Sequence, residues 1–263
     1  MKLRLGRYVY GLGGIAFGVT TLVWRQIDSL GNISHPEILV YLTGIAELVA
    51  GLAMQWQRTM RFGALTLSAF FSIFALYWIP QIVKTPLVFG PWGNLGEQFS
   101  IVLGGVFVVA STLRSNPERS ATITRAAYGS FGVCVVSYAL YQLFYLAYTA
   151  ELVPKWVPPG QMFWAIATTV AFALAAIAIL SGRLALLASQ LLTVMLVLFG
   201  LLVWLPPAFR EPQKMSNWTE FASTLGMAAS SWIVVDFLSQ PDADSRRWPF
   251  VHLRARQEES LPD

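Results

Sequence analysis

Charged residues are scarce in this chain of 263 residues: only 12% are Asp, Glu, Lys or Arg, whereas 56% are hydrophobic. A water-soluble domain spends about a quarter of its residues on charge to cover its surface. The mean hydropathy of +0.57 agrees with that shortage. The composition therefore excludes an ordinary soluble globular protein, and we expect the solvent of this chain to be a lipid bilayer.

Cysteine and histidine are also nearly absent. Because Cys134 is the single cysteine, no intrachain disulfide, redox pair or cysteine-based metal site can form. His35 and His252 lie far apart and flank the expected spans, so the paired histidines that hold a haem in a helical bundle are missing. No P-loop, HExxH or nucleophile-elbow motif occurs. We therefore expect no cofactor held by protein ligands, which leaves quinone as the candidate cofactor.

Eight segments are long and apolar enough to cross a membrane, because a hydrocarbon layer of about 30 Å takes about 20 residues of helix. They are approximately residues 8–24, 38–56, 62–83, 96–113, 126–148, 161–180, 184–205 and 218–238. The predicted fold class is an all-α integral membrane protein with eight transmembrane helices.

Basic residues are distributed unequally between the two sides of these segments. Thirteen lie on the side that holds both termini, and five lie on the other side: Arg25, Lys84, Lys155, Arg210 and Lys214. The positive-inside rule then places both termini in the cytoplasm, most simply at the cytoplasmic membrane of a prokaryote. The net charge of +4 follows from this topology. The lipid bilayer is the expected partner, and nucleic acid is not.

The chain contains an internal repeat. The pattern Arg-x-x-Tyr-Gly-x-x-Gly occurs at residues 7–14 and again at 125–132. Three further matches follow in order: Gly51 to Arg58 with Ala176 to Arg183, Trp78-Ile-Pro80 with Trp204-Leu-Pro206, and Asn94-x-x-Glu97 with Asn217-x-x-Glu220. We predict a tandem duplication with a four-helix unit at 1–113, a cytoplasmic linker at 114–124, a second four-helix unit at 125–238 and a cytoplasmic tail at 239–263. Units with an even number of spans share one orientation, and two four-helix bundles side by side are the simplest geometry.

The stretch Glu151-Leu-Val-Pro-Lys-Trp156-Val-Pro-Pro-Gly-Gln161-Met-Phe-Trp164 follows a helix with a Tyr-Gly-x-x-Gly core and precedes an Ala-rich helix. This arrangement resembles the DoxX-like family of small four-helix membrane proteins, best in the second half of the chain. The resemblance implies a four-helix bundle and an association with membrane redox complexes, since the family takes its name from the small subunit of a thiosulfate:quinone oxidoreductase.

Glu47 is the acidic residue that falls well inside an expected span. An ionised carboxylate near the bilayer midplane is disfavoured by about 3 kcal/mol or more, so Glu47 should face protein. It is either a proton-accepting or ligand-binding carboxylate, or a neutral carboxyl hydrogen-bonded to a Ser, Thr or Tyr of a neighbouring helix. The second half has Phe172 at the aligned position.

Two Asn-x-x-Glu pairs, Asn94 with Glu97 and Asn217 with Glu220, lie at the expected starts of the fourth and eighth spans. Asn as the N-cap with Glu three residues later is typical of a helix cap, and we favour this interpretation. Because the pair occurs in both halves, a ligand-binding role in an outward-opening pocket is the alternative. A third cap of this kind is expected at Ser34.

Arg7 and Arg125 open the first helix of each unit, where we expect their side chains to reach lipid phosphate. Tyr10 and Tyr128 lie one turn further in and are placed to hydrogen-bond across the bundle.

Two surface segments carry the remaining candidate residues. The loop from Glu151 through Trp156 to Gln161 is interpreted as a rigid connection between helices, with a lid or a partner-docking surface as the alternative. Arg246 and Arg247 in the tail are expected to lie on the membrane surface.

Three functions are compatible with the sequence. The first is a non-catalytic accessory subunit of a redox-linked membrane complex that contacts quinone. The second is a transporter or binder of a small lipophilic or acidic solute, and the third is a structural membrane protein. Because electron transfer needs a metal, flavin, quinone or thiol pair, we rank the accessory role first and expect no turnover by this chain alone.

Overall fold

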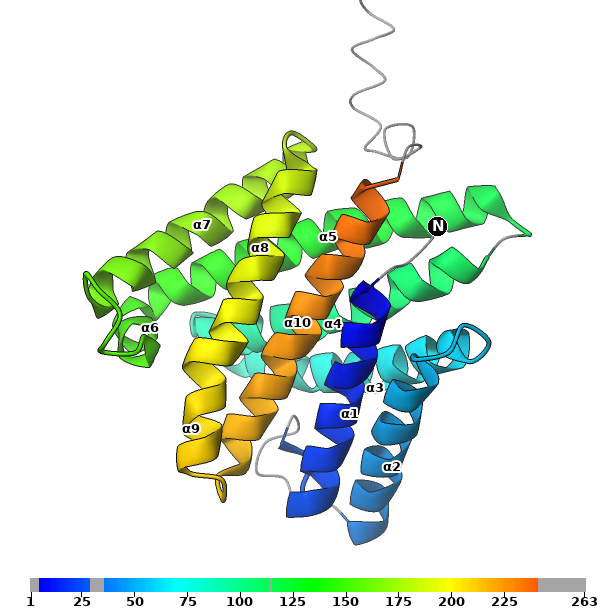
Figure 1. Cartoon of the computed structure of the whole chain (residues 1–263), viewed down its shortest axis with the longest axis horizontal. Helices are drawn as coiled ribbons and strands as arrows, with labels where there is room; N and C mark the ends of the chain where they lie inside the picture. The colour runs from blue at the N-terminus through cyan, green and yellow to red at the C-terminus, as the bar shows by residue number, and fades with distance from the viewer. Residues whose placement is uncertain (1–4, 29–35, 114, 241–263) are drawn as a thin grey trace, which may run out of the picture.

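The computed structural model describes residues 5–28, 36–113 and 115–240, and over these residues the chain consists of helices joined by short connections (Figure 1). The helices are α1 (Gly6–Trp24), α2 (Glu37–Ala53), α3 (Met60–Lys84), α4 (Phe89–Thr112), α5 (Pro117–Phe144), α6 (Leu146–Leu152), α7 (Gln161–Ser181), α8 (Ala185–Phe199), the π-helix η2 (Gly200–Trp204), α9 (Leu205–Arg210) and α10 (Met215–Leu238). Among the described residues, six helices are long and apolar enough to cross a membrane: α3, α4, α5, α7, α10 and the continuous helix Ala185–Arg210. The predicted all-α class is thereby confirmed for the described residues, and six of the eight expected spans qualify by length and hydropathy.

Two helices begin well before the positions expected from the sequence. α4 begins at Phe89 instead of Gly96, and α5 begins at Pro117 instead of Ala126. Pro117 stands in the first turn of its helix, where a missing N–H is harmless. The Asn116 side chain caps this helix by accepting a hydrogen bond from the Arg119 backbone N–H at 3.0 Å. The expected linker at 114–124 is therefore wrong in its second part, because residues 117–124 belong to α5.

The long helices form two layers of four that cross each other in the view of Figure 1. In one layer each helix contacts the next in the order α2, α1, α10, α8. In the other layer the order of contacts is α7, α5, α4, α3. The layers meet where α4 crosses α10, and also through the pairs α2 with α3 and α7 with α8.

Each layer takes two helices from each half of the chain. Within each half the helices contact one another in chain order: α1 with α2, α2 with α3 and α3 with α4, then α5 with α7, α7 with α8 and α8 with α10. The main neighbours of α1 are α2 and α10, and its contact with α4 is slight. Small residues explain this pairing, because a Cβ added to Gly13 of α1 would lie 3.5 Å from the backbone of Gly226 in α10. Such glycine contacts let helix axes approach closely in a membrane.

Glycines bring α1 and α2 even closer together. A Cβ on Gly51 would lie 2.6 Å from the Gly11 carbonyl oxygen, and one on Gly18 would lie 2.7 Å from the Gly44 carbonyl oxygen. These glycines therefore bring the backbones of α1 and α2 into close contact.

The helix bounds repeat with a constant offset in the later part of each half. α4 and α10 begin at Phe89 and Met215, 126 residues apart, and end at Thr112 and Leu238, again 126 apart. α3 ends at Lys84, and the matching helix of the second half ends at Arg210.

The helix ends gather on two opposite sides of the molecule. Toward the lower left of Figure 1 lie the α3–α4 connection, α6, α9 and the start of α10, together with the end of α1. Toward the upper right lie the start of α1, the α2–α3, α4–α5 and α7–α8 connections and the end of α10.

Candidate functional site

A cavity of about 590 Å³ lies between the two layers, within the second half of the chain. Its walls come from α5 and α7 of one layer and from α8, η2 and α10 of the other, while α6 and the loop after it line one end. Most lining side chains are apolar, such as Phe172, Met195 and Leu202. The volume and the apolar walls are those of a small-molecule site.

The matching space in the first half is filled by aromatic side chains. The ring centroids of Phe17 and Phe71 are 4.9 Å apart, and those of Phe71 and Phe74 are 5.7 Å apart. Only about 10 Å³ remains beside them, which is the volume of about one water molecule. The first half is therefore nearly filled, whereas the large cavity lies mainly in the second half.

Two carboxyl groups mark the polar end of the large cavity. Glu97 of α4 is half-buried and Glu220 of α10 is exposed, and both side chains line the cavity. Their carboxyl groups lie within electrostatic range of each other. Asp28, which follows α1, lies within range of Glu220 in turn. Glu97, Glu220 and Asp28 thus form an acidic cluster beside the cavity.

Tyrosines from α5 and α6 surround these carboxyl groups. Tyr138 is 4% exposed and lines the cavity. Its hydroxyl has no hydrogen-bond partner among the described residues. Burial, followed by the nearby carboxylates of Glu220 and Glu97, raises the pKa of Tyr148 above its ordinary value, so its hydroxyl stays protonated at neutral pH. Hydrogen-bond donors and carboxyl acceptors therefore meet at one end of an apolar space.

Gln142 holds the α5 wall against α7. Its side-chain oxygen accepts hydrogen bonds from the Thr168 hydroxyl at 3.0 Å and the Thr169 hydroxyl at 3.2 Å. Gln142 and Thr168 also line the cavity. The polar groups on this side are satisfied within the protein, in contrast to Tyr138.

The loop after α6 is part of the cavity wall. Trp156 lines the cavity although it is 70% exposed. Gln161 at the start of α7 fixes the loop, because its side-chain amide donates to the Val153 carbonyl at 2.6 Å. Glu151 is exposed and is not among the lining residues. Sequence reasoning gave this loop a connecting role and missed its place beside a cavity.

The cap interpretation of the Asn-x-x-Glu pairs is wrong. The N-caps of α4 and α10 are Val88 and Lys214, and neither receives a side-chain cap hydrogen bond. Asn94 lies inside α4, because that helix extends further toward its N-terminus than expected. The expected cap at Ser34 lies outside the described residues, and the N-cap of α2 is Pro36.

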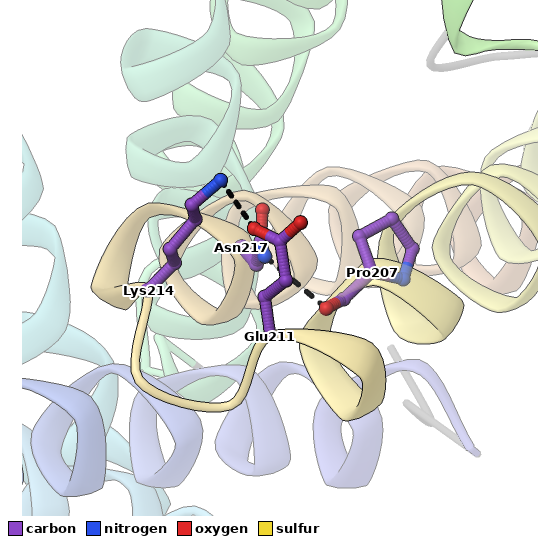
Figure 2. A network of polar contacts seen from close by, with 4 residues as sticks. All are labelled: Pro207, Glu211, Lys214 and Asn217. Atoms are coloured by element: carbon purple, nitrogen blue, oxygen red, sulfur yellow. Dashed lines mark hydrogen bonds and ion pairs between the residues drawn. The ribbon is translucent and has the colours of Figure 1, made fainter.

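Asn217 instead joins α9 to α10 (Figure 2). Its side-chain amide donates to the Pro207 carbonyl at 3.2 Å, and an ion pair between Lys214 and Glu211 spans the same turn. The residues of the two pairs that reach the cavity are therefore the glutamates, and Asn217 has a structural contact.

Glu47 faces the interior of the first half, as predicted. It is 1% exposed and accepts a hydrogen bond from the Thr21 hydroxyl of α1 at 3.2 Å. Together with Asp28 it lines the small residual cavity. The expected polar neighbour on another helix is thereby identified as Thr21.

The two tyrosines of the repeat bond across helices, as expected. The Tyr10 hydroxyl donates to the Ile101 carbonyl of α4 at 2.9 Å, and the Tyr128 hydroxyl donates to the Ile179 carbonyl of α7 at 2.5 Å. Neither tyrosine is among the residues lining the large cavity. Their contacts hold helices together.

The prediction that Arg7 reaches lipid phosphate is wrong. Arg7 is 4% exposed, its guanidinium lies 4.3 Å from the centroid of the Tyr8 ring, and it donates to the Met60 sulfur at 3.3 Å. Packing of α1 against its neighbours leaves no free path for this side chain to the surface. Arg125 is exposed on α5, and Arg246 and Arg247 lie outside the described residues.

No family model, curated protein or solved structure matches this chain at a significant level. The functional assignment of this membrane protein therefore rests on the geometry of its cavity.

Proposed function

We propose that this chain crosses the membrane eight times with both termini in the cytoplasm. Six helices qualify by length and hydropathy. The outward faces of α1 and α2 support the other two spans, because Leu12, Val23, Ile38, Leu42 and Ile45 are exposed apolar side chains. The start of α1 and the end of α10 lie on the same side of the molecule, which fits an even number of spans. More basic residues lie on the side of the termini than on the other side, and the positive-inside rule makes that side cytoplasmic.

We also propose that the chain is a tandem duplication. The contact order of one layer becomes that of the other when each helix is replaced by its counterpart in the other half. The counterparts are α1 and α5, α2 and α7, α3 and α8, and α4 and α10. The constant offset of 126 residues between α4 and α10 supports the same relation. In this register Asn94 corresponds to Glu220 and Glu97 to Ser223, so the two glutamates hold different positions.

As its function, we propose that the protein binds a small lipophilic molecule in the large cavity, as a carrier or receptor within the membrane. The observation that carries this proposal is an apolar space of about 590 Å³ with a polar end. A ligand with an apolar body and one polar group matches both parts of this lining. The earlier alternative of an acidic solute is disfavoured, because Glu97 and Glu220 would repel it.

The test is binding of a neutral solvatochromic dye to the purified protein in lipid nanodiscs. Ala171 of α7 lines the cavity, whereas Val170 beside it is 51% exposed. The substitution Ala171→Trp should fill the cavity and abolish dye binding, while Val170→Trp should leave it unchanged. Equal dye binding by both variants and the wild type would contradict the proposal.

A second candidate is the accessory role in a redox-linked complex, with quinone as the bound molecule. The observation that favours it is the unpartnered Tyr138 hydroxyl, which is suited to bond a quinone carbonyl. Purification from native membranes in mild detergent, followed by mass spectrometry, should then recover quinone and partner subunits. Recovery of neither, with dye binding intact, would leave the binding function and remove the redox association.

A further inference from the structure

The carboxyl groups at the polar end of the cavity lack a positive partner within the described part of the chain. The ion pair found there, between Lys214 and Glu211, lies outside the cavity. Glu97 and Glu220 interact with each other, and Asp28 adds a third negative group within range of Glu220. A carboxylate without a counter-charge is disfavoured once it is withdrawn from water, which applies most to the half-buried Glu97. A positive charge supplied by a ligand would remove this penalty.

The cavity also presents groups that favour a cation independently of the carboxylates. The Tyr138 side chain is buried and lines the cavity, and its hydroxyl, with the Ser100 side chain beside it, makes no hydrogen bond of good geometry, so it can bond a ligand. The rings of Tyr141, Tyr148 and Trp164 line the same space. Aromatic ring faces attract organic cations, because the electron-rich face of the ring carries a partial negative charge.

The remaining walls define the rest of the ligand. Beyond the polar end the cavity is lined by Leu, Val, Ala, Met and Phe side chains of α7, α8 and η2. A hydrated inorganic cation gains nothing from such walls, whereas an apolar organic body is stabilised by burying its surface against them. The ligand that satisfies both regions carries its charge on an apolar framework.

We propose that the cavity binds a lipophilic organic cation, such as a hydrophobic amine or quaternary ammonium compound, with its charge beside Glu97 and Glu220. This inference rests on the proposed binding function and names its ligand class. The cationic group lies at the α4–α10 end, and the apolar body extends between α7 and α8.

The test uses two probes of the same shape and opposite charge, tetraphenylphosphonium and tetraphenylborate. Binding to the purified full chain is measured by equilibrium dialysis in nanodiscs of uncharged phosphatidylcholine, so that lipid charge does not attract the probes. Tetraphenylphosphonium should bind, and tetraphenylborate should not. Glu220→Gln or Glu97→Gln should weaken binding of the cation about tenfold, and the double variant by more.

Two matched substitutions serve as controls. Glu118→Gln removes an exposed carboxylate on α5 far from the cavity lining, and Glu47→Gln removes a buried one that lines only the small cavity. Both should bind the cation like the wild type, and the neutral dye should bind to all four glutamine variants, which shows that they are folded.

The outcomes separate the two proposals. If the neutral dye binds but both charged probes bind equally, or if the cavity glutamine variants keep full affinity for the cation, the cation inference is overturned and the lipophilic-binding function stands. If the dye and tetraphenylphosphonium both fail to bind the wild type, both proposals fail. Loss of cation binding in Glu97→Gln and Glu220→Gln with dye binding retained supports both.

Discussion

Acidic side chains inside this protein are satisfied in different ways, residue by residue. Glu47 receives a hydrogen bond from Thr21 and is closed off from the large cavity. Asp236 near the end of α10 accepts from the Gly6 backbone N–H at 3.3 Å, at the start of α1, where a helix exposes free N–H groups and a partial positive charge. Glu97 and Glu220, in contrast, line the large cavity. The available partners therefore separate structural acids from the candidate ligand-binding pair.

Thr21→Val should destabilise the protein without affecting the large cavity. The substitution keeps the shape of the side chain but removes the donor to Glu47, and leaving a buried acceptor unsatisfied reduces stability by about 1–3 kcal/mol. The measurement is the thermal unfolding midpoint in detergent. Thr122→Val, on the exposed face of α5, is the matched control, and an equal midpoint for the two variants would show that the Thr21–Glu47 bond contributes nothing.

At the scale of helices, glycine contacts and indole hydrogen bonds fix how the elements meet. The glycines of α1 and α2 bring the two backbones together. At the starts of α4, α7 and α10 an indole N–H donates to a proline carbonyl six residues earlier: Trp92 to Pro86 at 3.2 Å, Trp164 to Pro158 at 2.9 Å and Trp218 to Pro212 at 3.1 Å. These bonds close the turn before each helix on the same side of the molecule.

Gly51→Ala should separate α1 from α2. The added methyl group would lie 2.6 Å from both the Gly11 carbonyl oxygen and the Ile15 backbone nitrogen, which are backbone atoms that cannot move alone. Overpacking of this kind reduces stability by about 1–3 kcal/mol. Gly90→Ala is the control, because its nearest neighbour is the Tyr145 hydroxyl at 3.5 Å. Thermal unfolding of the two variants compares them directly, and a lower midpoint for Gly90→Ala would refute the packing argument.

Trp218→Phe should loosen the start of α10. The ring is kept, but the donor to the Pro212 carbonyl is lost, which reduces stability by about 1 kcal/mol. Hydrogen exchange of backbone amides in the first turns of α10 should increase. Trp56→Phe, at a side chain that is 62% exposed after α2, should leave exchange in α10 unchanged, and unchanged exchange in both variants would remove the role given to the indole bond.

At the scale of the whole molecule, the two halves share an extensive interface. α1, near the N-terminus, lies beside α10, near the C-terminus, and α4 contacts both α5 and α10. Helices α1 and α4 of the first half are therefore covered in part by α10 and α5 of the second. The cavity lies in only one half because aromatic rings fill the corresponding space between α1, α2, α3 and α4.

The proposed topology predicts the behaviour of reporter fusions. A reporter active only outside the cytoplasm should be inactive when fused after Asp263 and active when inserted near Gly90, because the end of α10 and the start of α4 lie on opposite sides of the molecule. A cytoplasmic reporter at the same two positions is the control and should give the reverse pattern. Activity of the first reporter after Asp263 would contradict the assignment of the termini.

The sequence predicted the features that depend on local composition. Long apolar runs predicted an all-helical membrane protein, since crossing a bilayer requires such runs whatever their neighbours are. The buried position of Glu47 followed in the same way from the penalty on charge in lipid. Helix starts were less predictable, because Pro117 and the Gly and Pro residues around Phe89 resemble loop residues but are harmless in a first helical turn.

Only the tertiary structure decided which polar residues meet. Glu97, Tyr138 and Glu220 belong to three helices that are distant in sequence, and the crossing of two layers brings them to the end of one cavity. Likewise, the sequence contains Phe17, Phe71 and Phe74 in one half and Phe172 in the other, but only their packing makes one space full and the other open. Hydropathy is a property of each segment alone, whereas a cavity is a property of the gaps left when segments pack, so composition determined the membrane and packing determined the site.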